Sequence, residues 1–203
     1  MGKGEPKNLQ QLYVNMLTEA AARTNFIKEV LNKKIEIPTR PAFEICYLQL
    51  RMLCELIAIG CLAAHGDIPA TRSGKMRSAW AADRILGALE KLHPKFFPVP
   101  MKVRKINSKT VLLPRGEISI TKADVLTLYR RCGDILHRGS IEGMDWQKTH
   151  ESEFDQIGEW ALKIGELIKS HTISLHNSEN TLIWAHVDHS LTGYMELLRD
   201  GGR

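Results

Sequence analysis

The residues best suited to chemistry lie in one short stretch, residues 129–137, which reads YRRCGDILH. On a helix, Arg130 and His137 are seven residues apart, nearly two turns, so their side chains project from the same face. Gly133 lies between them and leaves an open notch on that face, and Asp134 is placed to orient the His137 ring. A guanidinium binds phosphate through paired N–H groups, and an imidazole moves protons near neutral pH. The stretch therefore predicts phosphodiester cleavage, with Arg130, Asp134 and His137 as candidate catalytic residues.

The same residues also have a structural interpretation. Arg130 can form a salt bridge beside the core, and His137 can interact with the last carbonyls of its helix. The two interpretations differ in whether Arg130 and His137 are accessible to solvent or buried against other protein groups.

Arg130 or Arg131, followed after six or five residues by His137 near the end of a helix, resembles the Arg-x(4–6)-His motif of the HEPN superfamily (higher eukaryotes and prokaryotes nucleotide-binding). The resemblance implies a helical bundle and metal-independent RNA cleavage, with the Arg and His of two protomers meeting at a homodimer interface. Members of the family usually have a polar residue directly after the Arg. Arg130 is followed by the polar Arg131, whereas Arg131 is followed by Cys132, so Arg130 fits the pattern better.

Positive charge is concentrated in the middle of the chain. Residues 71–115 contain eleven Lys or Arg and two acidic residues and so carry +9; because the whole chain carries +5, the remainder sums to −4. We therefore expect RNA or another anionic partner to bind there. The candidate RNA-binding residues are Lys102, Arg104, Lys105, Lys109 and Arg131. The alternative is a solvated basic face that binds nothing specific.

Apolar residues at intervals of three and four predict five helices, near residues 8–34, 41–65, 75–92, 122–137 and 145–170. The second helix is apolar around almost its whole circumference, which predicts that other helices surround it. Thr121 is expected to cap the fourth helix, with Asp124 at its third position, and Gly139 to end it.

Short β-rich runs predict strands at residues 101–106, 110–113, 118–120, 181–187 and 193–198. Since a lone hairpin is only marginally stable, we expect them to form one small antiparallel sheet. The predicted fold class is mainly α: a HEPN-like bundle of about five helices with a small antiparallel β-sheet appended (α+β). We expect a single domain over residues 1–203, with a helical core at about 8–93 and 121–172 and β segments at about 99–120 and 180–199.

The predicted central helix carries an alternating polar stripe made of Arg40, Glu44, Arg51 and Glu55. Unpaired charges are costly in such a helix, so a structural ion-pair network is one interpretation of the stripe. A polar wall of a cleft is the other. Three cysteines on the same helix, Cys46, Cys54 and Cys61, are expected to be buried reduced thiols.

Several classes of protein lose support from the sequence. Phosphate-binding loops, dinucleotide-binding loops, nucleophile elbows and zinc-protease motifs are missing from it, so we expect no metal and no cofactor. The longest apolar segment, residues 45–64, is interrupted by Gln49, Arg51 and Glu55, and the first residues do not read as a signal peptide. We therefore expect a cytoplasmic protein without a membrane partner.

Two functions follow from the sequence. The first is a HEPN-like RNA-binding protein that acts as a metal-independent endoribonuclease, in which Arg130 binds the scissile phosphate and His137 is the general acid or base. The second is a noncatalytic interaction module, or a subunit of a bacterial defence or toxin–antitoxin assembly, that binds a partner protein.

Overall fold

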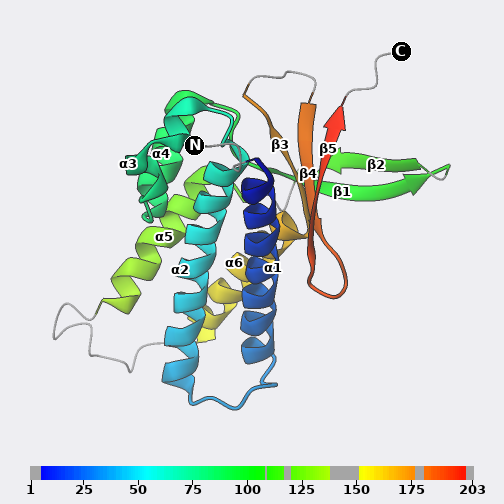
Figure 1. Cartoon of the computed structure of the whole chain (residues 1–203). Coiled ribbons are helices and arrows are strands. Elements are labelled where there is room, and N and C mark those ends of the chain that lie inside the picture. Colours follow the sequence, from blue (N-terminus) through cyan, green and yellow to red (C-terminus); the bar gives the residue numbers. More distant parts are fainter. Residues whose placement is uncertain (1–5, 108, 117–119, 138–150, 177–180, 200–203) are drawn as a thin grey trace.

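The computed structural model describes residues 6–107, 109–116, 120–137, 151–176 and 181–199. A bundle of helices forms one layer, and a five-stranded antiparallel sheet lies against one side of it (Figure 1). This arrangement confirms the predicted α+β class.

The helical layer is built around α2 (Thr39–Ala64). Contacts with α2 come from α1 (Pro6–Leu31), α4 (Ala82–Leu92), α5 (Lys122–Leu136) and α6 (Glu151–Lys169). The prediction that the second helix is surrounded by others is therefore confirmed.

By length and composition α2 is the one helix of the described residues that could cross a bilayer, and half of its apolar stretch is buried inside the protein. Side chains such as Leu50, Leu53 and Cys54 are fully buried against the neighbouring helices. A core helix of this kind is apolar on the sides that meet other helices.

The third predicted helix is wrong as a single element. The chain instead forms a 3₁₀ turn (Pro69–Arg72) and the one-turn α3 (Gly74–Arg77), and it breaks before α4 begins at Ala82. At the break, the Ser78 hydroxyl donates to the Gly74 carbonyl (2.8 Å), which competes with helix continuation. Trp80, which lies in this break, is 64% exposed.

The sheet has the order β2-β1-β3-β4-β5, with every neighbouring pair antiparallel. Its strands are β1 (Val99–Ile106), β2 (Lys109–Pro114), β3 (Ser170–Ser174), β4 (Thr181–Val187) and β5 (Gly193–Arg199). β3 follows α6 without a turn and was not predicted. It joins the two predicted β segments into one sheet, because β1 pairs with one of its edges and β4 with the other.

Three further predictions concern residues that lie wholly or partly outside the described ranges. The expected start of the last helix, residues 145–150, lies outside them, as do Gly139 and Ile118–Ser119. Ile120 is buried and belongs to no strand.

The sheet approaches the bundle most closely at Gly193, the first residue of β5. A Cβ atom there would lie 2.8 Å from the Val14 carbonyl oxygen and 3.1 Å from the Leu17 Cβ of α1. The Gly193 N–H also donates to Thr18 Oγ1 at 2.9 Å. Only glycine fits this contact, because the obstructing atoms belong to backbone and to the base of a side chain.

Gly193→Ala is therefore expected to lower the free energy of unfolding by about 1–3 kcal/mol, as overpacking does elsewhere. Urea denaturation measures this change. Gly87→Ala on α4 is the matched control, because no atom lies within 4 Å of its added Cβ. The same substitution there should stabilise slightly by restricting the unfolded chain. Equal stabilities of the two variants would contradict the expectation.

Candidate functional site

The residues predicted to be catalytic lie on α5, whose start is fixed by a capping box. Thr121 Oγ1 accepts from the Asp124 N–H (3.1 Å), and the Asp124 carboxylate accepts from the Thr121 N–H (2.8 Å), as predicted. Buried Val125, Leu128 and Cys132 fix one face of the helix against the core. The opposite side of α5 is thereby held toward solvent.

Arg130, Asp134 and His137 are all exposed on that solvent side. Arg130 Nε donates to the Leu126 carbonyl (3.3 Å), and its other nitrogens have no acceptor among the described residues. His137 is the C-cap of α5, and its backbone N–H donates to the Gly133 carbonyl (3.0 Å). Within the described part of the chain, Asp134 makes no hydrogen bond to the His137 ring. Arg130 and His137 are therefore accessible, which is the arrangement that chemistry requires.

Gly133 does not leave the open notch that the sequence suggested. The Arg51 guanidinium of α2 approaches it, and a Cβ at position 133 would lie 3.6 Å from Arg51 Nη1. Alanine would make an ordinary contact there, whereas a longer side chain would meet the guanidinium. The missing side chain thus lets Arg51 of α2 pack closely against α5.

Arg51 is held by a small network between α2 and α5. Its Nε donates to Glu55 at 3.3 Å, and its guanidinium lies 5.0 Å from the centroid of the Tyr129 ring. The Tyr129 hydroxyl in turn donates to Glu55 at 3.3 Å. Arg40 and Glu44 pair further along the same stripe (3.3 Å). The geometry of the stripe therefore agrees with the ion-pair interpretation.

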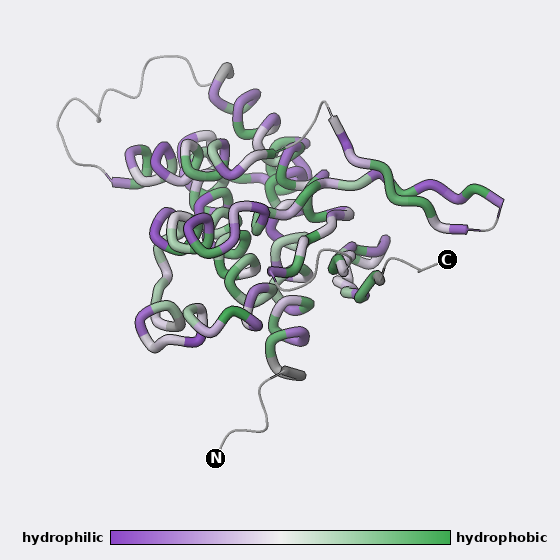
Figure 2. The backbone as a smooth tube through the Cα atoms, turned by 90° about the horizontal axis from the view of Figure 1, so that it is seen from above, coloured by the Kyte–Doolittle hydropathy of each residue, from purple (hydrophilic) through white to green (hydrophobic). Residues whose placement is uncertain are grey.

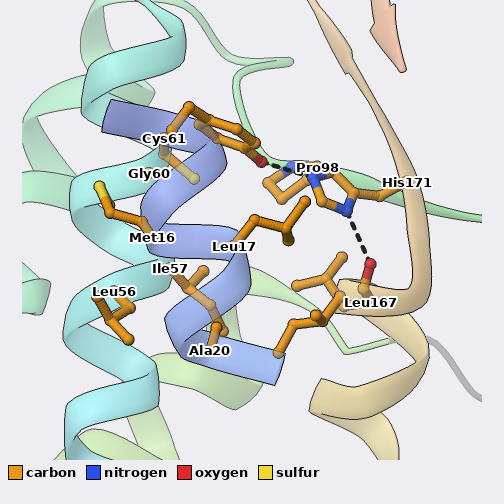
Figure 3. A pocket seen from close by; sticks show the side chains of 12 residues that line it. Met16, Leu17, Ala20, Leu56, Ile57, Gly60, Cys61, Pro98, Leu167 and His171 are labelled. Carbon is orange, nitrogen blue, oxygen red and sulfur yellow. Dashed lines mark hydrogen bonds between the residues drawn. The ribbon is translucent and has the colours of Figure 1, made fainter. Parts of the chain in front are cut away.

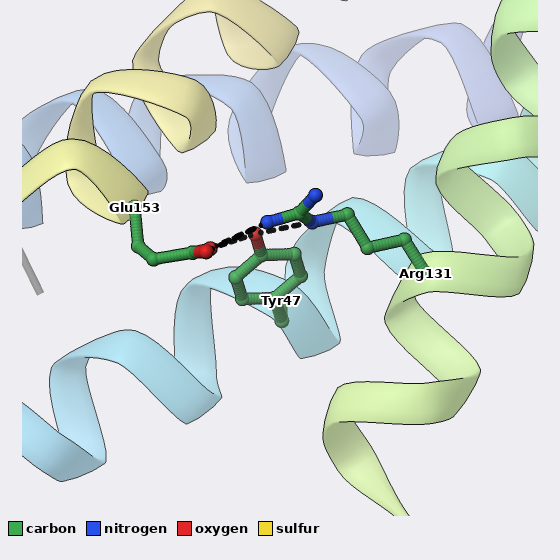
Figure 4. A network of polar contacts seen from close by, with 3 residues as sticks. All are labelled: Tyr47, Arg131 and Glu153. Carbon is green, nitrogen blue, oxygen red and sulfur yellow. Dashed lines mark hydrogen bonds and ion pairs between the residues drawn. The ribbon is translucent and has the colours of Figure 1, made fainter. Parts of the chain in front are cut away.

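The other arginine of the motif, Arg131, points to a different neighbour. Its Nη2 donates to both carboxylate oxygens of Glu153 on α6 (2.8 and 2.7 Å), and its Nε donates to the Tyr47 hydroxyl (3.1 Å) (Figure 4). The Glu153 hydrogen bonds raise the pKa of Arg131, and burial raises the pKa of Tyr47 to about 12. Because its guanidinium is already bound, Arg131 ties three helices together and is poorly placed to take a phosphate.

The remaining candidate RNA-binding residues lie on a β-hairpin formed by β1 and β2, which we call the β1–β2 arm (residues 99–114). Lys102, Arg104, Lys105 and Lys109 are all exposed on it. The arm extends beyond the rest of the sheet on the side away from the helices, and the end of α5 lies across the bundle from it (Figures 1 and 2). One protomer therefore does not bring the basic arm and the Arg130–His137 face together.

A second constellation, unrelated to the motif, lies between the bundle and β3. The Tyr13 hydroxyl lies 2.5 Å from His171 Nε2, and His171 Nδ1 lies 2.7 Å from the Leu167 carbonyl (Figure 3). Because a carbonyl only accepts, Nδ1 carries the proton and Nε2 accepts from the tyrosine. Burial lowers the pKa of His171 to about 4 and raises that of Tyr13.

The cavity beside this pair has a volume of about 40 Å³ and is lined mainly by apolar side chains. A cavity of this size holds a few water molecules, whereas ligand pockets are typically several hundred Å³. The Tyr13–His171 pair is therefore part of the core, and it carries no small-molecule site.

The prediction that Cys46, Cys54 and Cys61 are buried reduced thiols is confirmed. Cys46, Cys54, Cys61 and Cys132 are all free and buried. Burial raises the pKa of Cys46 to about 11 and those of Cys61 and Cys132 to about 12, so these thiols are protonated and unreactive at neutral pH. Among the described residues, no group of three His, Cys, Asp or Glu side chains is arranged to hold a metal ion.

Comparison with known proteins adds no relative to this description. No protein-family model, curated protein or solved structure matches the chain.

Proposed function

We propose that this protein binds RNA and cleaves it without a metal ion at the exposed face of α5. The observation that carries the proposal is the solvent exposure of Arg130 and His137 on the same side of one helix. A buried pair at these positions would have favoured a purely structural role.

The chemistry open to these groups is transfer within the RNA chain. The ribose 2′-hydroxyl attacks the adjacent phosphorus, so that an O2′–P bond forms and the P–O5′ bond breaks. The 2′-hydroxyl loses its proton to a base, and the departing O5′ receives a proton from an acid. The Arg130 guanidinium binds the phosphate oxygens, and His137 serves one of the two proton transfers.

One imidazole does not serve both transfers in the same step. A homodimer that apposes two α5 ends would supply the second imidazole and double the positive charge around the phosphate. The HEPN resemblance implies this arrangement, and we include it in the proposal.

The direct test incubates the purified protein with a mixed RNA pool in EDTA, beside His137→Ala. Cleavage in EDTA by the wild-type protein alone supports the proposal. Intact RNA with the wild-type protein, or equal cleavage by both proteins, contradicts it. In that case the exposed face of α5 belongs to the alternative function, a noncatalytic module of a defence or toxin–antitoxin assembly.

RNA binding by the β1–β2 arm makes a separate electrostatic prediction. Each phosphate neutralised on a single strand contributes about −0.7 to the slope of log K against log salt concentration. Replacing Lys102, Arg104 and Lys105 with Glu is expected to weaken binding for all sequences and to flatten that slope by about 2. Fluorescence anisotropy at several salt concentrations measures both quantities. Unchanged affinity would remove the arm from the proposal.

A further inference from the structure

The sheet has one covered face and one open face. α1 and α6 pack on the covered face, where Ile173, Ile183 and Ala185 are buried. No helix of the described residues lies on the other face (Figure 1). That open face mixes polar side chains with aromatic rings, whereas a solvent-facing sheet is normally polar.

The strand register shows which side chains share the open face. Residues directly opposite each other across a sheet lie on the same face. One such row consists of Val99, Thr172, Trp184 and Glu196. In the next row, His186 on β4 lies opposite Tyr194 on β5. Three rings therefore come together on neighbouring positions of one open surface.

These three rings form a continuous stack. The centroids of Trp184 and His186 are 4.4 Å apart with planes inclined by 22°, and those of His186 and Tyr194 are 5.4 Å apart at 17°. Hydrogen bonds hold both ends, because Trp184 Nε1 donates to Ser170 Oγ (3.0 Å) and the Tyr194 hydroxyl donates to Asp188 (3.1 Å). Tyr194 remains 43% exposed, so the stack ends in an accessible, fixed aromatic ring.

β1 continues beyond this face into the β1–β2 arm. On β1, Lys105 lies on the same side as Val99, whereas Lys102 and Arg104 lie on the other side. The arm contains four basic residues and no acidic residue, and its basic side chains are exposed. Exposed apolar side chains accompany them, with Val103 at 43% and Ile106 at 50%. A positively charged track beside fixed aromatic rings is the combination by which proteins bind single-stranded nucleic acids.

We propose that the open face of the sheet and the β1–β2 arm together bind a single strand of RNA. One base extends the stack at Tyr194, and the phosphates that follow lie along the β1–β2 arm, where Lys105 shares the side of the open face. Paired bases are not free to join the stack, so a duplex is excluded.

This inference deepens the proposed function by naming the surface that holds the RNA, and it rests on RNA binding but not on cleavage. Its test therefore uses a fluorescent single-stranded 2′-O-methyl RNA oligonucleotide, which lacks the attacking hydroxyl and stays intact. Tyr194→Leu is expected to weaken binding roughly 5- to 100-fold, the loss expected for one base stacked on a ring. Tyr194→Phe keeps the ring and should bind within about twofold of the wild-type protein.

A second aromatic residue provides the position control. Trp80 is more exposed than Tyr194 and lies between α3 and α4, away from the sheet, so Trp80→Leu should leave the affinity unchanged. Photocrosslinking of the wild-type protein to a 5-iodouridine oligonucleotide locates the contact without any substitution. Crosslinks on β4 and β5 support the proposal.

Three results would overturn the inference. They are wild-type affinity in folded Tyr194→Leu, equal affinity for the duplex form of the oligonucleotide, and crosslinks confined to the helices. If Tyr194→Leu instead dissociates an oligomer and leaves RNA affinity unchanged, the open face is a protein interface and the inference is equally wrong. Loss of cleavage with intact oligonucleotide binding would refute the proposed catalysis alone.

Discussion

Replacing His137 with alanine is expected to lower the rate of RNA cleavage by roughly 10²- to 10⁴-fold, the usual contribution of a positioned acid or base. The fold should survive, because His137 is exposed and follows the last residue of α5. Its free energy of unfolding should change by less than about 0.5 kcal/mol. Initial rates on end-labelled RNA in EDTA measure the effect, and thermal melting checks the fold.

A histidine outside the proposed site supplies the control for this experiment. His176 is exposed beyond the end of β3, and His176→Ala should cleave RNA at the wild-type rate. Equal losses in His137→Ala and His176→Ala would mean that the cleavage does not depend on α5.

The two neighbouring arginines separate phosphate recognition from structural support. Arg130→Lys should slow cleavage roughly 10- to 100-fold, because lysine keeps the charge but loses the planar pair of donors. Arg131→Lys should instead lower stability by about 1 kcal/mol, since it breaks the paired bonds to Glu153 at a partly exposed site. If Arg131→Lys slows cleavage and Arg130→Lys only lowers stability, Arg131 is the arginine of the motif.

The buried Tyr13–His171 pair gives the second large expectation, a loss of stability in mild acid. The unfolded chain protonates His171 near pH 6.5, whereas burial holds the pKa in the folded protein at about 4. Between these values the unfolded state binds one proton more, so the free energy of unfolding falls as pH falls. The full stability is present above pH 6.5, and about 3 kcal/mol should be lost by pH 4.

Urea denaturation between pH 7.5 and 4 measures this loss. His171→Gln removes the titrating ring and keeps an amide that can pair with Tyr13 and with the Leu167 carbonyl. In this variant, the difference in bound protons between the unfolded and the folded state should be smaller by about one over this pH range. Burial also lowers the pKa of His65, so a smaller slope of the same sign should remain. An unchanged slope in His171→Gln would show that His171 does not titrate in this range.

The sequence by itself determined the helices and strands that patterns of neighbouring residues indicate. The period of apolar residues located α1, α2 and α5 to within a few residues, and the capping box at Thr121 located the start of α5. Alternation and turn residues located β4 and β5. Hydrogen bonds within one helix or one hairpin join residues that are close in the chain. The sequence patterns that favour these bonds can therefore be recognised without knowing the fold.

The exposure of Arg130 and His137 was consistent with helical spacing, but spacing alone left it undecided. A helical wheel says which residues share a face and does not say which face meets the core. That choice was made by the buried contacts of Val125, Leu128 and Cys132 with the surrounding helices.

Only the tertiary structure decided which distant residues meet. β3 carries no strong strand signal and follows α6 directly, so its role depends on the two edges that β1 and β4 present to it. Arg51 reaches Gly133, and Arg131 reaches Glu153, through the packing of α2, α5 and α6. The aromatic stack joins Trp184 and His186 on β4 to Tyr194 on β5 through strand register. Such contacts depend on how whole elements pack, which no local pattern of residues encodes.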